Sequence, residues 1–95
     1  MPKLKVIWSD ESLQALDTII DYIFEEWGIQ PIMDLQYEID RLIHLIKENK
    51  NLCPKSKTLN VRKCVLSEQT SMVYKIERSH LEIITFVDNR SRHNY

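Results

Sequence analysis

The segment that decides the fold is residues 59–90, which read LNVRKCVLSEQTSMVYKIERSHLEIITFVDNR. They predict three consecutive strands, Val61–Leu66, Met72–Glu77 and Leu81–Val87, because each run is rich in β-branched and aromatic residues and short polar joints separate the runs. Joints this short force neighbouring strands to run antiparallel, so the segment should form a meander. We expect one face of this meander to pack against helices. The other face and the chain beyond Val87 carry Lys, Arg and His, and we expect functional residues there.

Residues 3–49 predict one strand and two helices. Lys3–Trp8 alternates polar and apolar residues, which is typical of a half-buried strand. Ser9 suits the N-cap of a first helix, and Gly28, the only glycine of the chain, suits its C-terminal end. Pro31 suits the first turn of a second helix that should extend to about Asn49. Apolar residues spaced by three and four give each helix one apolar stripe: Leu13, Leu16, Ile20, Ile23 and Trp27 in the first, and Ile32, Leu35, Ile39, Leu42 or Ile43, and Ile46 in the second. The aromatic residues expected at core or boundary positions are Trp8, Tyr22, Trp27 and Tyr37.

The predicted element order is strand, helix, helix, strand, strand, strand. This order predicts an α+β fold, an antiparallel sheet with a two-helix hairpin packed on one face, in a single domain spanning residues 1–95. The sequence has no apolar run of membrane-span length and no secretory leader, so we expect a cytoplasmic protein. Cys53 and Cys64 have no metal-ligand pattern around them, and we interpret both as free thiols.

The formal charge of −1 conceals an asymmetry along the chain. Between Asp10 and Lys50 ten acidic residues stand against three basic ones, whereas from Asn51 onward eight basic residues stand against four acidic ones. The helices should therefore present an acidic surface, and the sheet and tail a mildly basic one. An anionic partner would meet the sheet side first, although solvated acids on helices would give the same pattern.

A set of cations and proton-carrying side chains lies on the predicted sheet and tail. Its members are Arg62, Lys63, Lys75, Arg90, Arg92, His93 and Tyr95. Cations can hold phosphates and stabilise developing negative charge, while His or Tyr can exchange a proton. A site of this kind could cleave RNA without a metal if the 2′-hydroxyl attacks the adjacent phosphate. Strand alternation places Arg62 and Lys63 on opposite faces, and simple solvation of these charges is the alternative. No motif indicates a cofactor or a metal site.

The order and spacing of several short segments resemble the RelE/ParE superfamily of toxins from bacterial type II toxin–antitoxin modules. The resemblance covers nearly the whole chain. The matching segments are Val6-Ile7-Trp8-Ser9, the helix with Leu13 and Leu16, Ile20-Ile23-Phe24 with Trp27, Val61-Arg62-Lys63, Met72-Val73-Tyr74-Lys75-Ile76, and Ile83-Ile84-Thr85-Phe86-Val87-Asp88-Asn89-Arg90. The resemblance implies a toxin that arrests growth and is neutralised by an antitoxin, as in plasmid stabilization systems. It also implies a homodimer or a heterotetramer with the antitoxin.

Two activities occur among proteins of this kind. RelE-like members cut mRNA on the ribosome without a metal, and ParE-like members lack the nuclease residues and poison DNA gyrase. The resemblance matches Arg62 to a basic nuclease residue, Arg90 to the arginine of a His-Arg pair, and Tyr95 to a terminal tyrosine, with His93 as a substitute for the missing histidine. If the chain is a nuclease, these four residues are its catalytic candidates.

RelE-like members carry a further arginine, at the start of an Arg-Leu-Val-Tyr segment. The resemblance matches this position to Ser71, so the arginine is missing from its expected place in this chain. This departure, together with a slightly acidic chain, favours a ParE-like, non-nuclease toxin. A RelE-like ribosome-dependent endoribonuclease and an inactive relative that only binds antitoxin are the alternatives.

Overall fold

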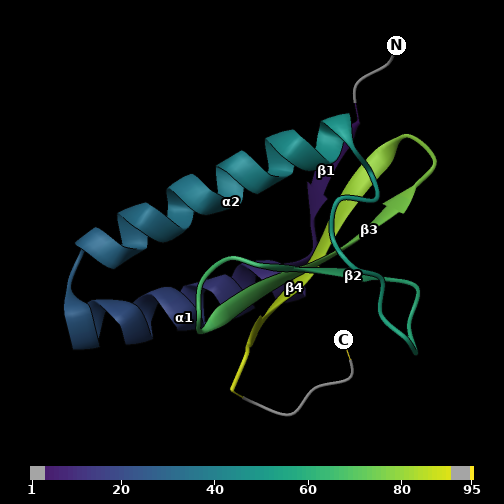
Figure 1. Ribbon diagram of the computed structural model, residues 1–95. Coiled ribbons are helices and arrows are strands. Elements are labelled where there is room, and N and C mark those ends of the chain that lie inside the picture. Colours follow the sequence, from purple (N-terminus) through teal and green to yellow (C-terminus); the bar gives the residue numbers. More distant parts are fainter. Residues whose placement is uncertain (1–3, 91–94) are drawn as a thin grey trace.

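The computed structural model describes residues 4–90 and 95. The chain forms β1 (Lys5–Trp8), α1 (Asp10–Trp27), α2 (Gln30–Glu48), β2 (Arg62–Val65), β3 (Thr70–Glu77) and β4 (His80–Asp88). As Figure 1 shows, the two helices form a hairpin on one side of the sheet. The α+β class and the predicted order of elements are thereby confirmed. Within the described ranges, no helix combines the length and apolarity that a membrane crossing requires.

The helix ends follow from local chemistry. The Ser9 side chain accepts a hydrogen bond from the Ser12 backbone N–H, as an N-cap should, and Asp10 and Glu11 occupy the first turn. α1 ends before Gly28, whose φ of 84° is a conformation that side-chain-bearing residues rarely adopt. Pro31 lies in the first turn of α2. These short-range signals confirm the predicted helix boundaries to within a residue or two.

The sheet has the strand order β1-β4-β3-β2. The three C-terminal strands form the predicted antiparallel meander, with Tyr74 of β3 facing Arg62 of β2 and Ile83 of β4. β1, however, pairs in parallel with β4, so the sheet is mixed rather than antiparallel throughout. The difference arises because the helical hairpin lies between β1 and the meander in the chain. A connection that long leaves the direction of β1 free.

The core lies between the helical hairpin and one face of the sheet. The helices contribute buried residues that follow the predicted stripes, namely Leu16, Leu35, Ile39, Leu42 and Ile46. The sheet contributes alternate strand positions, among them Met72, Tyr74, Leu81 and Ile83. Trp8 stacks on Phe86, with 5.8 Å between ring centroids, and joins the edge of this core. The predicted location of the core is therefore confirmed.

Three aromatic residues depart from the predicted pattern. Tyr22, Trp27 and Tyr37 are 44%, 53% and 70% exposed, so the expectation that packing explains them was wrong. Tyr22 and Trp27, near the end of α1, contact each other edge-on with 5.8 Å between ring centroids, and the rest of their surface is open to solvent. Their exposure leaves aromatic surface open to a partner.

Cys53 and Cys64 form a disulfide, so the interpretation as free thiols was wrong. The loop after α2 folds back along the outer edge of β2. There Lys55 bridges to Arg62, and the Lys63 backbone N–H donates to the Pro54 carbonyl at 3.1 Å. This return places the two cysteine Cα atoms 5.3 Å apart. Spacing in the sequence could not reveal the pairing, because it depends on the path of the loop.

Candidate functional site

Arg62 holds the loop in place and also lines a cavity of about 160 Å³ with Lys55 and Lys75. Alternation along β2 directs it toward the face that carries Tyr74, its cross-strand partner. Its Nη1 donates to the Cys53 carbonyl at 2.8 Å. The Tyr74 hydroxyl in turn donates to the Lys50 carbonyl at 3.0 Å, and burial raises the pKa of this phenol. Arg62 and Tyr74 together hold the start and middle of the loop against the sheet.

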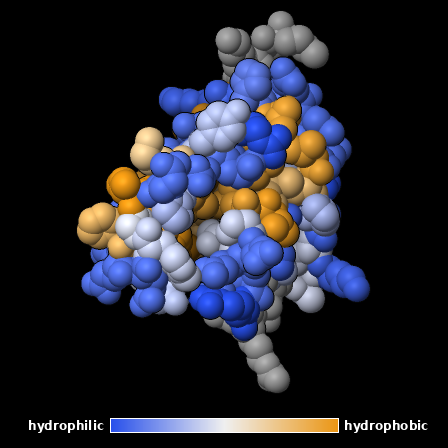
Figure 2. All heavy atoms as spheres, turned by 60° about the vertical axis from the view of Figure 1, so that its left-hand side comes forward, coloured by the Kyte–Doolittle hydropathy of each residue, from blue (hydrophilic) through white to orange (hydrophobic). Residues whose placement is uncertain are grey.

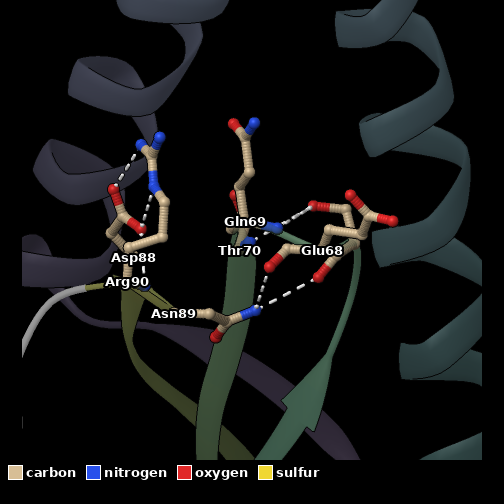
Figure 3. Close-up of polar contacts among 7 residues, drawn as sticks. Glu68, Gln69, Thr70, Asp88, Asn89 and Arg90 are labelled. Carbon is tan, nitrogen blue, oxygen red and sulfur yellow. Dashed lines mark hydrogen bonds and ion pairs between the residues drawn. The ribbon is translucent and has the colours of Figure 1, made fainter.

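Arg90 lies just beyond the end of β4 and is held by Asp88. Its Nε and Nη2 donate to the two carboxylate oxygens of Asp88 at 3.0 and 2.8 Å, a bidentate pair (Figure 3). Hydrogen bonds from the Arg90 side chain lower the pKa of Asp88 to about 2. Tyr22 of α1 lines the same cavity as Asp88 and Arg90. The positive charge of Arg90 is therefore largely compensated by its neighbour.

Arg62 and Arg90 lie apart on the sheet. Arg62 pairs with Tyr74 on β3, whereas Asp88, which precedes Arg90, pairs with Thr70. Tyr74 and Thr70 are four residue steps apart on β3, which is about 13 Å along the strand. The predicted pair of phosphate-holding arginines is not brought together by the fold.

Lys75, another predicted cation, also has acidic partners. Its Nζ lies 2.9 Å from the Glu77 carboxylate and 3.8 Å from that of Glu82, with all three on the face opposite the helices. The hydrogen bond that Lys75 donates to the Glu77 carboxylate raises the pKa of Lys75 and lowers that of Glu77. This group is a local ion-pair cluster and provides little net positive charge.

Ser71 is fully buried and holds a turn in place. Its hydroxyl donates to the Oδ1 of Asn89 at 2.5 Å. The Nδ2 of Asn89 donates to the carbonyls of Ser67 and Glu68, and its backbone N–H donates to the Gln69 carbonyl at 2.7 Å (Figure 3). Ser71 and Asn89 therefore fix the β2–β3 turn by hydrogen bonds. Sequence analysis missed this role, because it depends on a contact between residues 18 positions apart in the chain.

Tyr95 lies at a cavity of about 370 Å³ beside the disulfide loop. Lys55, Lys63 and Val65 line the same cavity. Lys63 faces away from Arg62, as alternation predicted, so the cations that accompany Tyr95 are lysines. His93 lies outside the described residues. Of the four predicted catalytic residues, the described ones, Arg62, Arg90 and Tyr95, occupy three separate places.

A larger groove of about 480 Å³ opens between the helical hairpin and the β2–β3 turn. Its apolar lining residues are Ile23, Trp27, Pro31, Leu35 and Leu66, and its acidic lining residues are Asp34, Glu38 and Glu68. In Figure 2, hydrophobic side chains form the floor of a hollow that hydrophilic side chains surround. Sequence analysis did not predict this groove, because its two walls are about thirty residues apart in the chain.

Comparison with known proteins matches the fold. No protein-family model matches the sequence, and no curated protein matches it. Among solved structures, the chromosomal ParDE toxin–antitoxin system from P. aeruginosa superposes with a TM-score of 0.74 at 15% identity, covering 93% of this chain and 98% of that one.

Two further structures show the same relation. The YoeB/ParE toxin from Agrobacterium tumefaciens gives a TM-score of 0.66 at 15% identity, covering 90% and 99% of the two chains. The YoeB–YefM complex from Staphylococcus aureus gives 0.62 at 15% identity, covering 90% and 95%. The chain therefore has the fold of these toxin structures, which is the fold that the resemblance in its sequence implied.

Proposed function

We propose that this protein is the toxin of a bacterial type II toxin–antitoxin module, that it acts in the cytoplasm, and that a cognate antitoxin neutralises it. The fold over nine-tenths of the chain supports this proposal, and so do neighbours that come from the ParDE system and the YoeB–YefM complex. The acidic groove and the exposed aromatic side chains on the hairpin offer surface for a protein partner.

Of the two activities, the ParE-like one, directed at gyrase or another non-nuclease target, fits the site better. The observation that carries this choice is the separation of Arg62 and Arg90, each engaged by its own neighbour. Metal-free cleavage of a phosphodiester needs cations and a proton carrier directed at one phosphate. Ser71, at the place of the family's arginine, adds no charge there. A toxin that acts through an interface requires no such convergence.

One observation favours the second candidate, a ribosome-dependent endoribonuclease. Tyr95 shares its cavity with Lys55 and Lys63, which joins a proton carrier to two cations. The overall charge of −1 opposes this candidate, because binding to RNA depends strongly on the release of counterions by basic surface. A relative that only binds antitoxin is the third candidate, and it predicts no growth arrest.

Inducible expression in bacteria tests the proposal, with pulse labelling of DNA and protein synthesis in one culture. We expect growth arrest, a fall in DNA synthesis before protein synthesis, and inhibition of purified gyrase. The variant Lys63→Ala/Tyr95→Phe should remain toxic, because neither residue is needed for a ParE-like action. Translation that stops first, together with loss of toxicity in this variant, would establish the nuclease instead. Arg62 is unsuitable for this test because its removal would also release the loop that holds Cys53.

A further inference from the structure

The groove between the helical hairpin and the β2–β3 turn combines an apolar floor with an acidic rim. Apolar lining comes from both helices, with Ile23 and Trp27 on α1 and Leu35 on α2. Trp27 is 53% exposed and contacts Tyr22 edge-on, so its indole is available to a partner while its orientation is held. A partly exposed, positioned aromatic beside an apolar hollow is a common anchor point of protein interfaces.

The rim carries charge of one sign. Asp34 and Glu38 stand one turn apart on α2, and Glu68 extends toward α2 from the facing turn (Figure 3). Among residues 4–90 and 95, none of those that line the groove is Lys, Arg or His. Arg41, outside this lining, pairs with Glu38. Asp34 accepts a hydrogen bond only from a neutral amide, that of Gln30, among the contacts of the described residues.

The wall that carries Glu68 is preorganised. Asn89 binds three successive carbonyls of the β2–β3 turn, and the Ser67 hydroxyl accepts from the backbone N–H groups of Gln69 and Thr70. The turn is thus fixed by its own hydrogen bonds, and a ligand would not have to order it. Preorganisation of this kind lowers the entropic cost of binding.

We propose that this groove binds a cationic amphipathic segment of the antitoxin, with two or three apolar side chains on its floor and lysine or arginine against Asp34, Glu38 and Glu68. The inference rests on the proposed function for the identity of the partner. The sign of the charge follows from the rim alone. A volume of about 480 Å³ accommodates a few large side chains and suits the apolar face of a short helix.

A charge-reversal pair tests the rim in growing cells. The variant Asp34→Lys/Glu68→Lys leaves the Glu38–Arg41 pair intact and changes two exposed residues. The control Asp17→Lys/Asp40→Lys makes the same change in charge at exposed helix positions outside the groove, and Asp40 accepts from a glutamine four residues away, Gln36, as Asp34 does. Each chain is expressed with the product of the neighbouring small open reading frame. We expect the rim variant to arrest growth and escape rescue, while the control is rescued. Rescue of both variants would overturn the inference.

A binding measurement with synthetic peptides keeps the two proposals separable. In a Trp8→Phe background Trp27 is the sole tryptophan, so its fluorescence reports the groove. The probes are two 18-residue helical peptides with the same leucine stripe, one flanked by lysines and the other by glutamates. We expect the lysine peptide to bind about tenfold more tightly, the equivalent of about 1.4 kcal/mol. The rim variant should reverse this preference and the control should keep it.

The outcomes of the two measurements divide the proposals. If the protein prefers the lysine peptide but does not arrest growth, the proposed specificity of the groove is supported and the proposed toxin function is refuted. If the protein arrests growth but binds both peptides equally, the proposed toxin function is supported and the proposal that the groove binds a cationic segment is refuted. Added salt should weaken only the lysine peptide, because the contacts that distinguish it lie on the solvent-exposed rim.

Discussion

The disulfide between Cys53 and Cys64 should contribute a substantial part of the stability of this small domain. The cysteines are separated by 11 residues in the sequence. Closing a loop of that length restricts the unfolded chain by an amount equivalent to about 3 kcal/mol. A domain of this size has roughly 5–15 kcal/mol of stability in total. Reduction should therefore lower the melting temperature by roughly 12–24 °C, since each kcal/mol corresponds to about 4–8 °C in domains of 60–100 residues.

The native structure itself should survive reduction. The Cys53 carbonyl still accepts from Arg62, the Lys50 carbonyl from Tyr74, and the Pro54 carbonyl from the Lys63 backbone. These hydrogen bonds hold the loop on the sheet edge without the covalent link. A toxin acting in a reducing cytoplasm would keep its fold for this reason, with a smaller margin of stability.

Urea denaturation of the oxidised and the reduced protein measures this effect. The double variant Cys53→Ala/Cys64→Ala is the control, and reductant should leave its unfolding midpoint unchanged. Near-ultraviolet circular dichroism checks that the reduced protein remains native in water. A difference in unfolding free energy below about 1 kcal/mol would refute the loop-closure argument. Two titratable thiols in the unreduced, denatured protein would refute the disulfide itself.

Three further predictions concern the turns at the two ends of the meander. Asn89→Ala should lower the unfolding free energy by about 1–3 kcal/mol, because it leaves the buried Ser71 hydroxyl without its acceptor. Chemical denaturation measures this loss, and a loss no greater than that of an exposed control such as Gln36→Ala would contradict the prediction. Asp88, with a folded-state pKa of about 2, stabilises the fold above its unfolded pKa near 4, and this is lost as the pH falls from about 4 to 2. The pair is exposed, so the loss should stay below about 1 kcal/mol, and Asp88→Asn should abolish this part of the acid dependence of the urea midpoint. Arg78 has a φ of 52° in the β3–β4 turn, so Arg78→Gly should raise the melting temperature slightly; a clear decrease would show that the turn imposes no strain.

Local patterns in the sequence determined the elements and their faces. Ser9, Gly28 and Pro31 placed the helix ends, because capping and backbone conformation depend only on neighbouring residues. The three- and four-residue spacing of apolar side chains selected the buried faces, as Ile39 and Ile46 show. The short joints of the meander fixed its antiparallel order. The order of these elements predicted the α+β fold, and the resemblance to a toxin family agreed with it.

Tertiary structure alone decided the site. Whether Arg62 would meet a phosphate or the Cys53 carbonyl depended on the path of a loop, and Arg90 was compensated by Asp88 elsewhere on the sheet. The parallel direction of β1, the pairing of the two cysteines and the meeting of Asp34 with Glu68 across a groove all depend on the same kind of contact. Such contacts join residues that are distant in the chain, and no short-range periodicity encodes which of them will meet. Sequence therefore determined which faces of this protein are buried, and the folded chain determined which charges stand together.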